Sequence, residues 1–159
     1  MKKNLWIVLS LVLIFGMVGL GHSGDVKKGI HVGNAGAFTG DAAAPCAEIY
    51  NSAQIAIDEW NAKGGIQGVK IEQIMGDDAM DPAQGVNVAH KFVADELMYG
   101  VVGPPMSHIA QATLKIYGSA DMACITTAAS KPDLTEQATR TFSGSTPATM
   151  LTAGIAPSS

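Results

Sequence analysis

Two hydroxyl side chains follow short apolar runs of the sequence, a position from which they could hold a small polar solute. Ser107 comes after the run that ends at Gly103, and Ser130 after the run that ends at Thr126. Ser107 also stands where a helix is expected to begin, and the free N–H groups and partial positive charge of a helix N-terminus favour a carboxylate. The carbonyl of Ala128 and the hydroxyl of Ser130 could accept hydrogen bonds from an ammonium group. Together these residues suit the head group of an α-amino acid.

A simpler interpretation stays open for both serines. Ser107 could do no more than cap its own helix, and Ser130 could do no more than stabilise its turn. The two interpretations differ in what the hydroxyl of Ser107 contacts, because a capping side chain bonds to backbone N–H groups of its own helix.

Three carboxylates offer an alternative chemistry. Asp77, Asp78 and Asp81 could coordinate Mg²⁺, which prefers oxygen ligands. No His, Lys or nucleophile stands at a readable spacing from them, and Asp81 followed by Pro82 is typical of a helix start. The glycine-rich loop at 33–40 lacks the spacings of nucleotide-binding loops. We therefore expect no enzyme, no metal and no cofactor.

Short apolar runs alternate with segments of helical periodicity, which indicates a parallel sheet flanked by helices. We predict strands at 30–35, 69–75, 99–103 and 122–126. Helices are expected from about Pro45 to the Lys63-Gly64-Gly65 stop, from Asp81 to about Leu97, and from Ser107 to about Ile116. Their apolar spacing predicts the buried sides, which are Ala47, Tyr50, Ala53, Ile57 and Trp60 in the first helix, Val86, Ala89, Val93 and Leu97 in the second, and Ile109, Ala112 and Ile116 in the third. Residues 76–78 are expected to leave the sheet after the second strand. Four strands and three crossovers predict a three-layer, doubly wound α/β domain. Ligands bind beyond the carboxyl ends of such strands, where Ser107, Ala128 and Ser130 stand.

The two ends of the chain differ from its middle in residue composition. Residues 1–23 combine two lysines, an apolar run at 5–20 and small residues up to Ser23, the pattern of a cleaved signal peptide that exports the chain to the periplasm. A retained membrane anchor is the alternative, because the run is nearly long enough to span a bilayer. Residues 24–138 form the expected domain. Residues 139–159 are rich in Thr, Ser, Ala and Pro, and we expect this tail to be poorly ordered, or ordered only with a partner.

Charge and cysteine content exclude other classes of protein. The formal net charge is −4 and no long basic run occurs, so nucleic acid is not an expected partner. Cys46 and Cys124 lie far apart, which fits no CxxC metal or redox spacing. Cys124 stands in an apolar run, and we expect it to be a small buried thiol.

Several motifs in order resemble the leucine/isoleucine/valine-binding proteins, the periplasmic solute-binding components of ABC importers. These are NAKGGI at 61–66, DDAMDP at 77–82, ITTAAS at 125–130 and the loop at 33–40. The similarity spans about residues 29–145, and no single motif carries it. It implies the N-terminal lobe of a type I periplasmic binding protein fold, which closes over an amino acid and delivers it to membrane permease subunits. The position of Ser107 would hold the ligand carboxylate, and those of Ala128 and Ser130 the ammonium.

The chain also departs from the family pattern. Pro45 stands where many members have a Tyr that packs on the ligand, so the solute is left open. Met80 and Met106 replace a disulfide that some members have. His108 could contact ligand, although a solvent-facing side chain is the simpler interpretation. The family chain continues into a second lobe and returns, and we expect this chain to be truncated before that lobe. A remnant or interaction fragment without ligand capture is therefore the alternative function.

Overall fold

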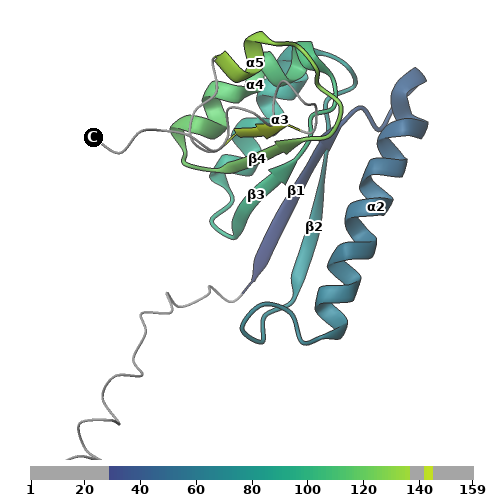
Figure 1. The fold of residues 1–159 in the computed structure, drawn as a ribbon, viewed down its shortest axis with the longest axis vertical. Helices are drawn as coiled ribbons and strands as arrows, with labels where there is room; N and C mark the ends of the chain where they lie inside the picture. Colours follow the sequence, from purple (N-terminus) through teal and green to yellow (C-terminus); the bar gives the residue numbers. More distant parts are fainter. Residues whose placement is uncertain (1–28, 137–141, 145–159) are drawn as a thin grey trace, which may run out of the picture.

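The structure, a computed structural model, describes residues 29–136 and 142–144, which form a single parallel sheet. Five strands lie in the order β2-β1-β3-β4-β5 (Figure 1). Their bounds are Ile30–Gly36 (β1), Ile71–Asp77 (β2), Met98–Val102 (β3), Ala123–Thr126 (β4) and Phe142–Gly144 (β5). The four predicted strands are confirmed. The fifth lies within 139–159, where we expected no regular structure; the rest of that stretch and the predicted signal peptide lie outside the described residues.

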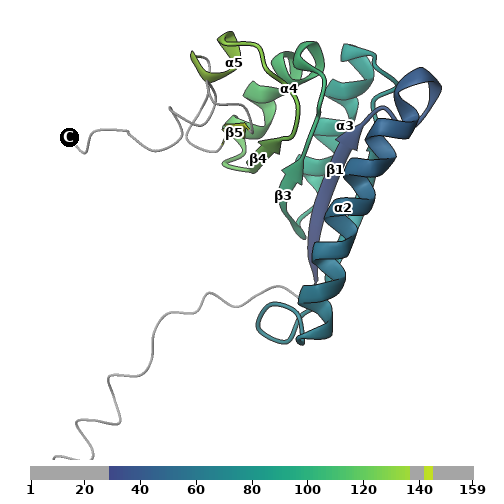
Figure 2. The same ribbon diagram turned by 45° about the vertical axis from the view of Figure 1, so that its right-hand side comes forward.

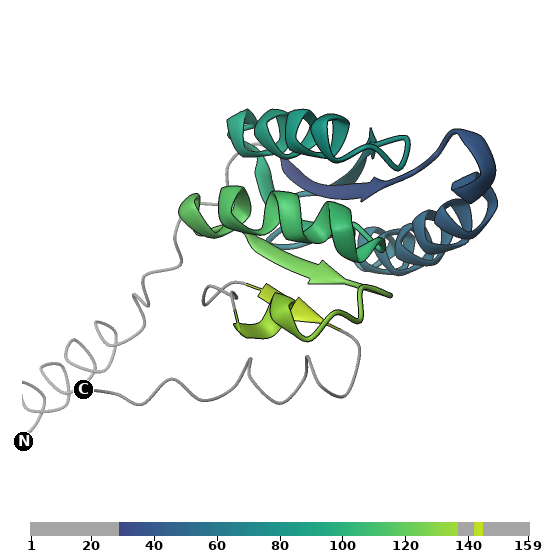
Figure 3. The same cartoon turned by 90° about the horizontal axis from the view of Figure 1, so that it is seen from above.

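Helices cover both faces of the sheet, so the predicted three-layer, doubly wound α/β fold is confirmed. A 3₁₀ turn at Gly40–Ala42 leads into α2, Ala43–Ala62, which lies on one face. Two helices, α3 (Pro82–Ala94) and α4 (Ser107–Ser119), lie side by side on the other face, with the short α5 (Asp133–Glu136) beside α4 (Figures 2 and 3). In the described part of the chain, no helix combines the length and apolar character needed to cross a membrane.

The predicted start of α3 is confirmed, and its predicted buried face is confirmed in part. Asp81 caps the helix by accepting a hydrogen bond from the Gln84 amide at 2.9 Å, and Pro82 follows at the first helical position. Of the residues predicted for the buried face, Ala89 is buried, Val86 and Val93 are half-buried, and Leu97 lies beyond the helix. The other buried residues are Gly85 and Phe92. Gly85 lets α3 approach α4, because a Cβ there would lie 2.6 Å from Ile109.

Phe92 is the centre of the core on this face. It is 1% exposed and lies against two neighbouring strands at the positions of Gly33 and Gly76. A Cβ at Gly33 would come within 2.8 Å of the ring, and one at Gly76 within 2.7 Å. The two glycines therefore form a flat seat for the ring. In α4 the buried residues are Ile109, Ala110, Thr113, Leu114 and Tyr117, of which only Ile109 was predicted.

The other face is less completely packed. Of the residues predicted to form the buried side of α2, Ile57 is buried, whereas Ala47 and Trp60 are exposed, Trp60 to 55%. Helical periodicity marks a side that can be buried, but it does not provide the element that buries it. The end of α2 is as predicted, with Gly64 and Gly65 at φ of 102° and 74°.

The second strand begins later than predicted. Val69 is not in β2, because it exchanges two backbone hydrogen bonds of 2.9 Å with Ile66 and closes a tight turn. Gly76 and Asp77, expected to leave the sheet, instead remain paired with Ala35 and Gly36 of β1. The strand thus carries Asp77 to the carboxyl edge of the sheet, where the candidate site lies.

Candidate functional site

The carboxyl edge of the sheet brings together the loops that contain the predicted site residues. Ser107 is the first residue of α4, after the loop that follows β3, and Ala128 and Ser130 follow β4. Because β3 and β4 are hydrogen-bonded neighbours, their loops lie side by side. The backbone N–H of Ser130 donates to Ser107 Oγ at 3.2 Å. Ser107 is half-buried, and Ala128 and Ser130 are exposed.

Ser107 does not cap its own helix. The N-cap position of α4 is Met106, which makes no side-chain cap, and the hydroxyl of Ser107 contacts the next loop instead. The interpretation that Ser107 only caps its own helix is therefore wrong, because Ser107 is the first helical residue and not the N-cap. Its hydroxyl joins two loops at the edge of the sheet.

Thr126 holds these two loops together from below, and sequence reasoning missed it. It is fully buried at the end of β4. Its Oγ1 donates to the carbonyl of Pro104 at 2.7 Å and accepts a hydrogen bond from the Ala129 N–H at 3.4 Å. A hydroxyl at the last position of an apolar strand was the one available signal. Thr126 positions Ala128 and Ser130 without itself being exposed.

Asp77 fixes the loop that follows β1. Its carboxylate accepts hydrogen bonds from the Phe38 N–H and the Thr39 hydroxyl, both at 2.8 Å, and from the Ala79 N–H at 2.9 Å. Burial favours the neutral acid, but these hydrogen bonds outweigh it and hold the pKa of Asp77 below its usual value. The role of Asp77 is to connect loops, which the sequence alone did not indicate.

Asp78 lies in the opposite environment. It is completely buried, and one of its oxygens accepts from the Met80 N–H at 2.9 Å while the other has no partner among the described residues. Burial raises the pKa of Asp78, the Met80 hydrogen bond opposes this, and the negative charge of Asp77 raises it further. With Asp81 engaged as a helix cap, the three carboxylates make separate contacts. Among the described residues, no group of His, Cys, Asp and Glu is arranged to hold a metal ion.

The sulfur-containing residues near the site differ in their surroundings. Met106 contacts a small cluster of Ala37, Ala42 and Cys46, whereas Met80 is 42% exposed. The two cysteines are free and buried; Cys124 donates from Sγ to the Gly103 carbonyl at 3.2 Å. Burial raises the pKa of Cys124 to about 12, so the predicted small buried thiol is confirmed.

His108 and Pro45, which the sequence analysis also considered, lie at the edge of the candidate site. His108 is exposed, and its Nε2 lies 3.3 Å from the Met80 carbonyl. Pro45 is exposed near the start of α2 and lines a hollow of about 660 Å³ between α2 and the strand ends. Its other lining residues are Glu48, Ile49, Ser52, Ala53, Val102 and Thr127.

The residues and loops described above fall within a stretch that matches a known family. The family of periplasmic binding proteins matches residues 29–157. The chain belongs to the periplasmic binding protein family. This confirms the resemblance drawn from the four motifs.

Members of this family with curated names are similar to the chain over much of its length. A Leu/Ile/Val-binding protein of Rhizobium johnstonii is 39% identical over 108 residues, covering 68% of this chain and 29% of the relative. A leucine-specific-binding protein of Salmonella typhimurium is 38% identical over 126 residues, covering 79% of this chain and 34% of the relative. The chain thus spans about a third of the length of these relatives.

Solved structures agree with the fold. A branched-chain amino acid transporter substrate-binding protein from Streptococcus pneumoniae, determined in complex with isoleucine, superposes with a TM-score of 0.67 at 28% identity. The match covers 73% of this chain and 33% of that protein. The predicted N-terminal lobe of a type I periplasmic binding protein is consistent with this partial coverage.

Proposed function

We propose that the chain contributes one side of an amino-acid-binding cleft to the substrate-binding component of an ABC importer. The solute would be a branched-chain or related amino acid, the location the periplasm after export, and the partner the permease subunits of the membrane. The relatives named for leucine, isoleucine and valine binding support this substrate class.

The observation that carries the proposal is the hydrogen bond between Ser130 N–H and Ser107 Oγ. It brings a hydroxyl at the N-terminus of α4 within reach of the turn that contains Ala128. We assign the ligand carboxylate to Ser107 and the first N–H groups of α4, where the helix dipole favours an anion. The ammonium would bond to the Ala128 carbonyl and the Ser130 hydroxyl.

In this arrangement the Ser130 N–H is already satisfied by Ser107. A bound carboxylate would break that internal hydrogen bond and accept one from the ligand-binding groups instead. The new hydrogen bond would therefore add only part of its free energy to binding. One lobe also leaves half of the ligand exposed, so we expect weak binding to this chain alone. The positions of the groups, rather than a high affinity, are what the proposal predicts.

The test is a Ser107→Ala variant titrated with leucine, isoleucine and valine by calorimetry. We expect binding to weaken by about 1 to 2 kcal/mol, because a hydrogen bond to a charged group is lost. Unfolding in urea should change by less than about 0.5 kcal/mol, because the Ser130 N–H that loses its acceptor is exposed and can bond to water instead. Ser119→Ala, at the other end of α4, is the matched control and should alter neither quantity.

Two results would contradict the proposal. Equal losses of affinity and stability in the Ser107 variant would give its hydroxyl a purely structural role. No saturable heat from the unaltered chain with any of the three amino acids would favour the alternative of a fragment that does not capture ligand.

A further inference from the structure

Three consecutive residues at the start of α4 each contact a different loop at the carboxyl edge of the sheet. Met106 packs against residues of the loop after β1. Ser107 accepts a hydrogen bond from the Ser130 N–H, in the loop after β4. His108 contacts the carbonyl of Met80, in the turn after β2. The start of α4 is therefore held by contacts to three loops that are far apart in the sequence.

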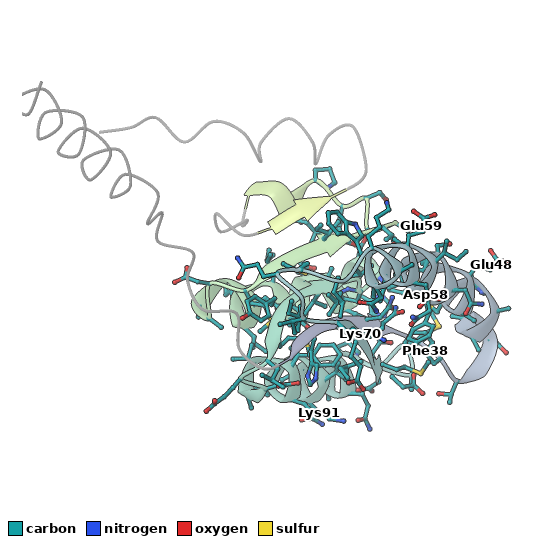
Figure 4. All side chains as sticks on the ribbon, turned by 90° about the horizontal axis from the view of Figure 1, so that it is seen from below. Phe38, Glu48, Asp58, Glu59, Lys70 and Lys91 are labelled. Atoms are coloured by element: carbon teal, nitrogen blue, oxygen red, sulfur yellow. The ribbon has the colours of Figure 1, made fainter. Side chains whose placement is uncertain are left out.

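The contact of Met106 is apolar. Its side chain packs against the buried cluster that includes Ala37 and Cys46. Phe38 packs on the same cluster and lies beside α2, where its ring meets that of Tyr50 edge-on at 5.8 Å (Figure 4). Apolar packing has no preferred direction, so it fixes the position of the helix start better than the orientation of the helix.

The turn that His108 contacts has a strained backbone. Ala79 and Met80 have φ of 48° and 60°, in the left-handed region that residues other than glycine rarely adopt. Such a conformation persists only where surrounding contacts hold it. The Ala79 N–H donates to Asp77 Oδ1, and the Met80 N–H donates to Asp78 Oδ1, both at 2.9 Å. These bonds tie the turn to the end of β2 and leave the Met80 carbonyl for a partner outside the turn.

That partner is the imidazole of His108, whose Nε2 lies 3.3 Å from the Met80 carbonyl oxygen. A carbonyl only accepts hydrogen bonds, so Nε2 carries a proton and donates it. Met80 thus bonds to Asp78 through its N–H and to His108 through its carbonyl. Burial raises the pKa of Asp78, and the positive charge that His108 carries when protonated acts in the opposite direction. The two side chains therefore interact across a single residue.

The hydrogen bond of His108 is directional, unlike the packing of Met106. Its length and angle depend on how α4 is rotated about its own axis. The first N–H groups of α4, which would hold the ligand carboxylate, have no partner within the helix and rotate with it. The turn after β2 is a fixed reference, because Asp77 and Asp78 hold it against the sheet. A bond from the second helical residue to this turn therefore sets the direction of those N–H groups.

We propose that His108 is a positioning residue for the carboxylate site, because its hydrogen bond to the Met80 carbonyl fixes the rotation of α4 and so aims the first N–H groups of the helix at the ligand. This role rests on the proposed function, since it requires a bound solute. His108 then acts without touching the solute, which differs from both interpretations that the sequence left open.

Two variants of His108 in the purified full chain test this role by calorimetry with isoleucine. His108→Ala removes the donor and should weaken binding about threefold to tenfold, the effect of one lost hydrogen bond. His108→Gln keeps an N–H donor at similar reach and should bind within about twofold of the unaltered chain. His90→Ala is the matched control, because His90 is an exposed histidine in the second half of α3. This variant should bind as the unaltered chain does.

Amide hydrogen exchange, measured by NMR without solute, tests the contact itself. In His108→Ala the Met80 N–H should exchange about threefold faster or more, because the strained turn opens more often once its carbonyl is released. Exchange at Met80 in His108→Gln and His90→Ala should match that of the unaltered chain. Urea unfolding of each variant verifies that the fold is retained.

The contrary results can be told apart. Unchanged isoleucine binding by His108→Ala would overturn the role of His108 and leave the proposed function standing. Equal losses of affinity in His108→Ala and His108→Gln would also overturn it, because the donor would then not be what matters. So would faster exchange throughout α4 and β4 in His108→Ala, which would give His108 a general structural role. If the unaltered chain binds none of leucine, isoleucine and valine, the proposed function and the role of His108 both fail, whatever the exchange at Met80.

Discussion

At the scale of single residues, two neighbouring carboxylates show how position decides chemistry. Asp77 is held ionised by three hydrogen bonds from loops on either side of it. Asp78, one residue later, is buried with one oxygen unpartnered among the described residues. Their pKa values are therefore moved in opposite directions, that of Asp77 downward and that of Asp78 upward.

The two residues should consequently give opposite responses to pH. The stabilisation by Asp77 is present above its unfolded pKa and is lost as pH falls through its lowered folded pKa. Asp78 binds a proton more tightly in the folded chain, so its contribution falls as pH rises through its raised pKa. Asp77→Asn should cost about 1 to 2 kcal/mol at pH 7 and less at low pH.

For Asp78→Asn we expect a gain of up to about 1 kcal/mol at pH 7 that disappears near pH 4, because the buried charge is removed. Urea unfolding of both variants and the unaltered chain, at pH 4 and pH 7, measures this. Parallel pH profiles for the two variants would contradict the assignment.

How far the site could be predicted also depends on single residues. The turns that contain Ser107, Ala128 and Ser130 were predictable, because apolar strands end at recognisable breaks and parallel strands share an edge. The contacts of Thr126 and Asp77 were not, since each joins backbone groups more than twenty residues away in the chain. Such pairings depend on strand order, which local patterns do not encode. A difference of one residue also decides the simpler interpretation of Ser107, because the N-cap of α4 is Met106 and Ser107 is the first helical residue.

At the scale of helices and strands, starts and stops were more predictable than buried faces. Asp81 with Pro82 marked the start of α3, and Gly64 with Gly65 marked the end of α2, because caps depend on local backbone chemistry. The buried faces of α3 and α4 follow instead from which residues fit between packed elements. Gly85 and Phe92 are extreme in size, and a pattern that counts only apolar residues gives them no special weight.

The cap of α3 gives a prediction at this scale. Asp81→Ala should destabilise the chain by about 0.5 to 2 kcal/mol, because the Gln84 N–H loses its acceptor. Asp81→Asn retains a side-chain oxygen and should cost much less. Chemical denaturation followed by circular dichroism measures both. Equal stability of Asp81→Ala and the unaltered chain would contradict the assignment of Asp81 as the cap.

At the scale of the whole molecule, the order of the five strands could not be predicted from the sequence. The order β2-β1-β3-β4-β5 places the edge strand β5 in a segment rich in Ser, Thr and Ala. Its residues carry no alternating apolar pattern, and their pairing with β4 is what makes them a strand.

Export is the prediction that concerns the whole chain. When the full chain is expressed in a Gram-negative host, we expect periplasmic protein whose first residue lies near Gly24, because residues 1–23 carry the pattern of a cleaved signal peptide. Intact mass spectrometry measures the cleavage point. Leu11→Arg, which places a charge within the apolar run, should leave uncleaved chain in the cytoplasm. Membrane-bound protein that retains Met1 would show an anchor instead.

The packing of Phe92 against two glycines limits how the sequence of this lobe can vary. One ring touches Gly33 and Gly76 on adjacent strands, so a methyl group added at either glycine pushes the ring toward the other. Side chains added at the two positions would therefore compete for the same space, so the effects of substitutions at Gly33 and Gly76 should not be independent. A lineage that acquires a smaller residue at 92 would release Gly33, whereas Gly76 would also need a smaller side chain at Val88, whose Cγ1 would lie 2.4 Å from a Cβ at Gly76. These four positions should therefore change together.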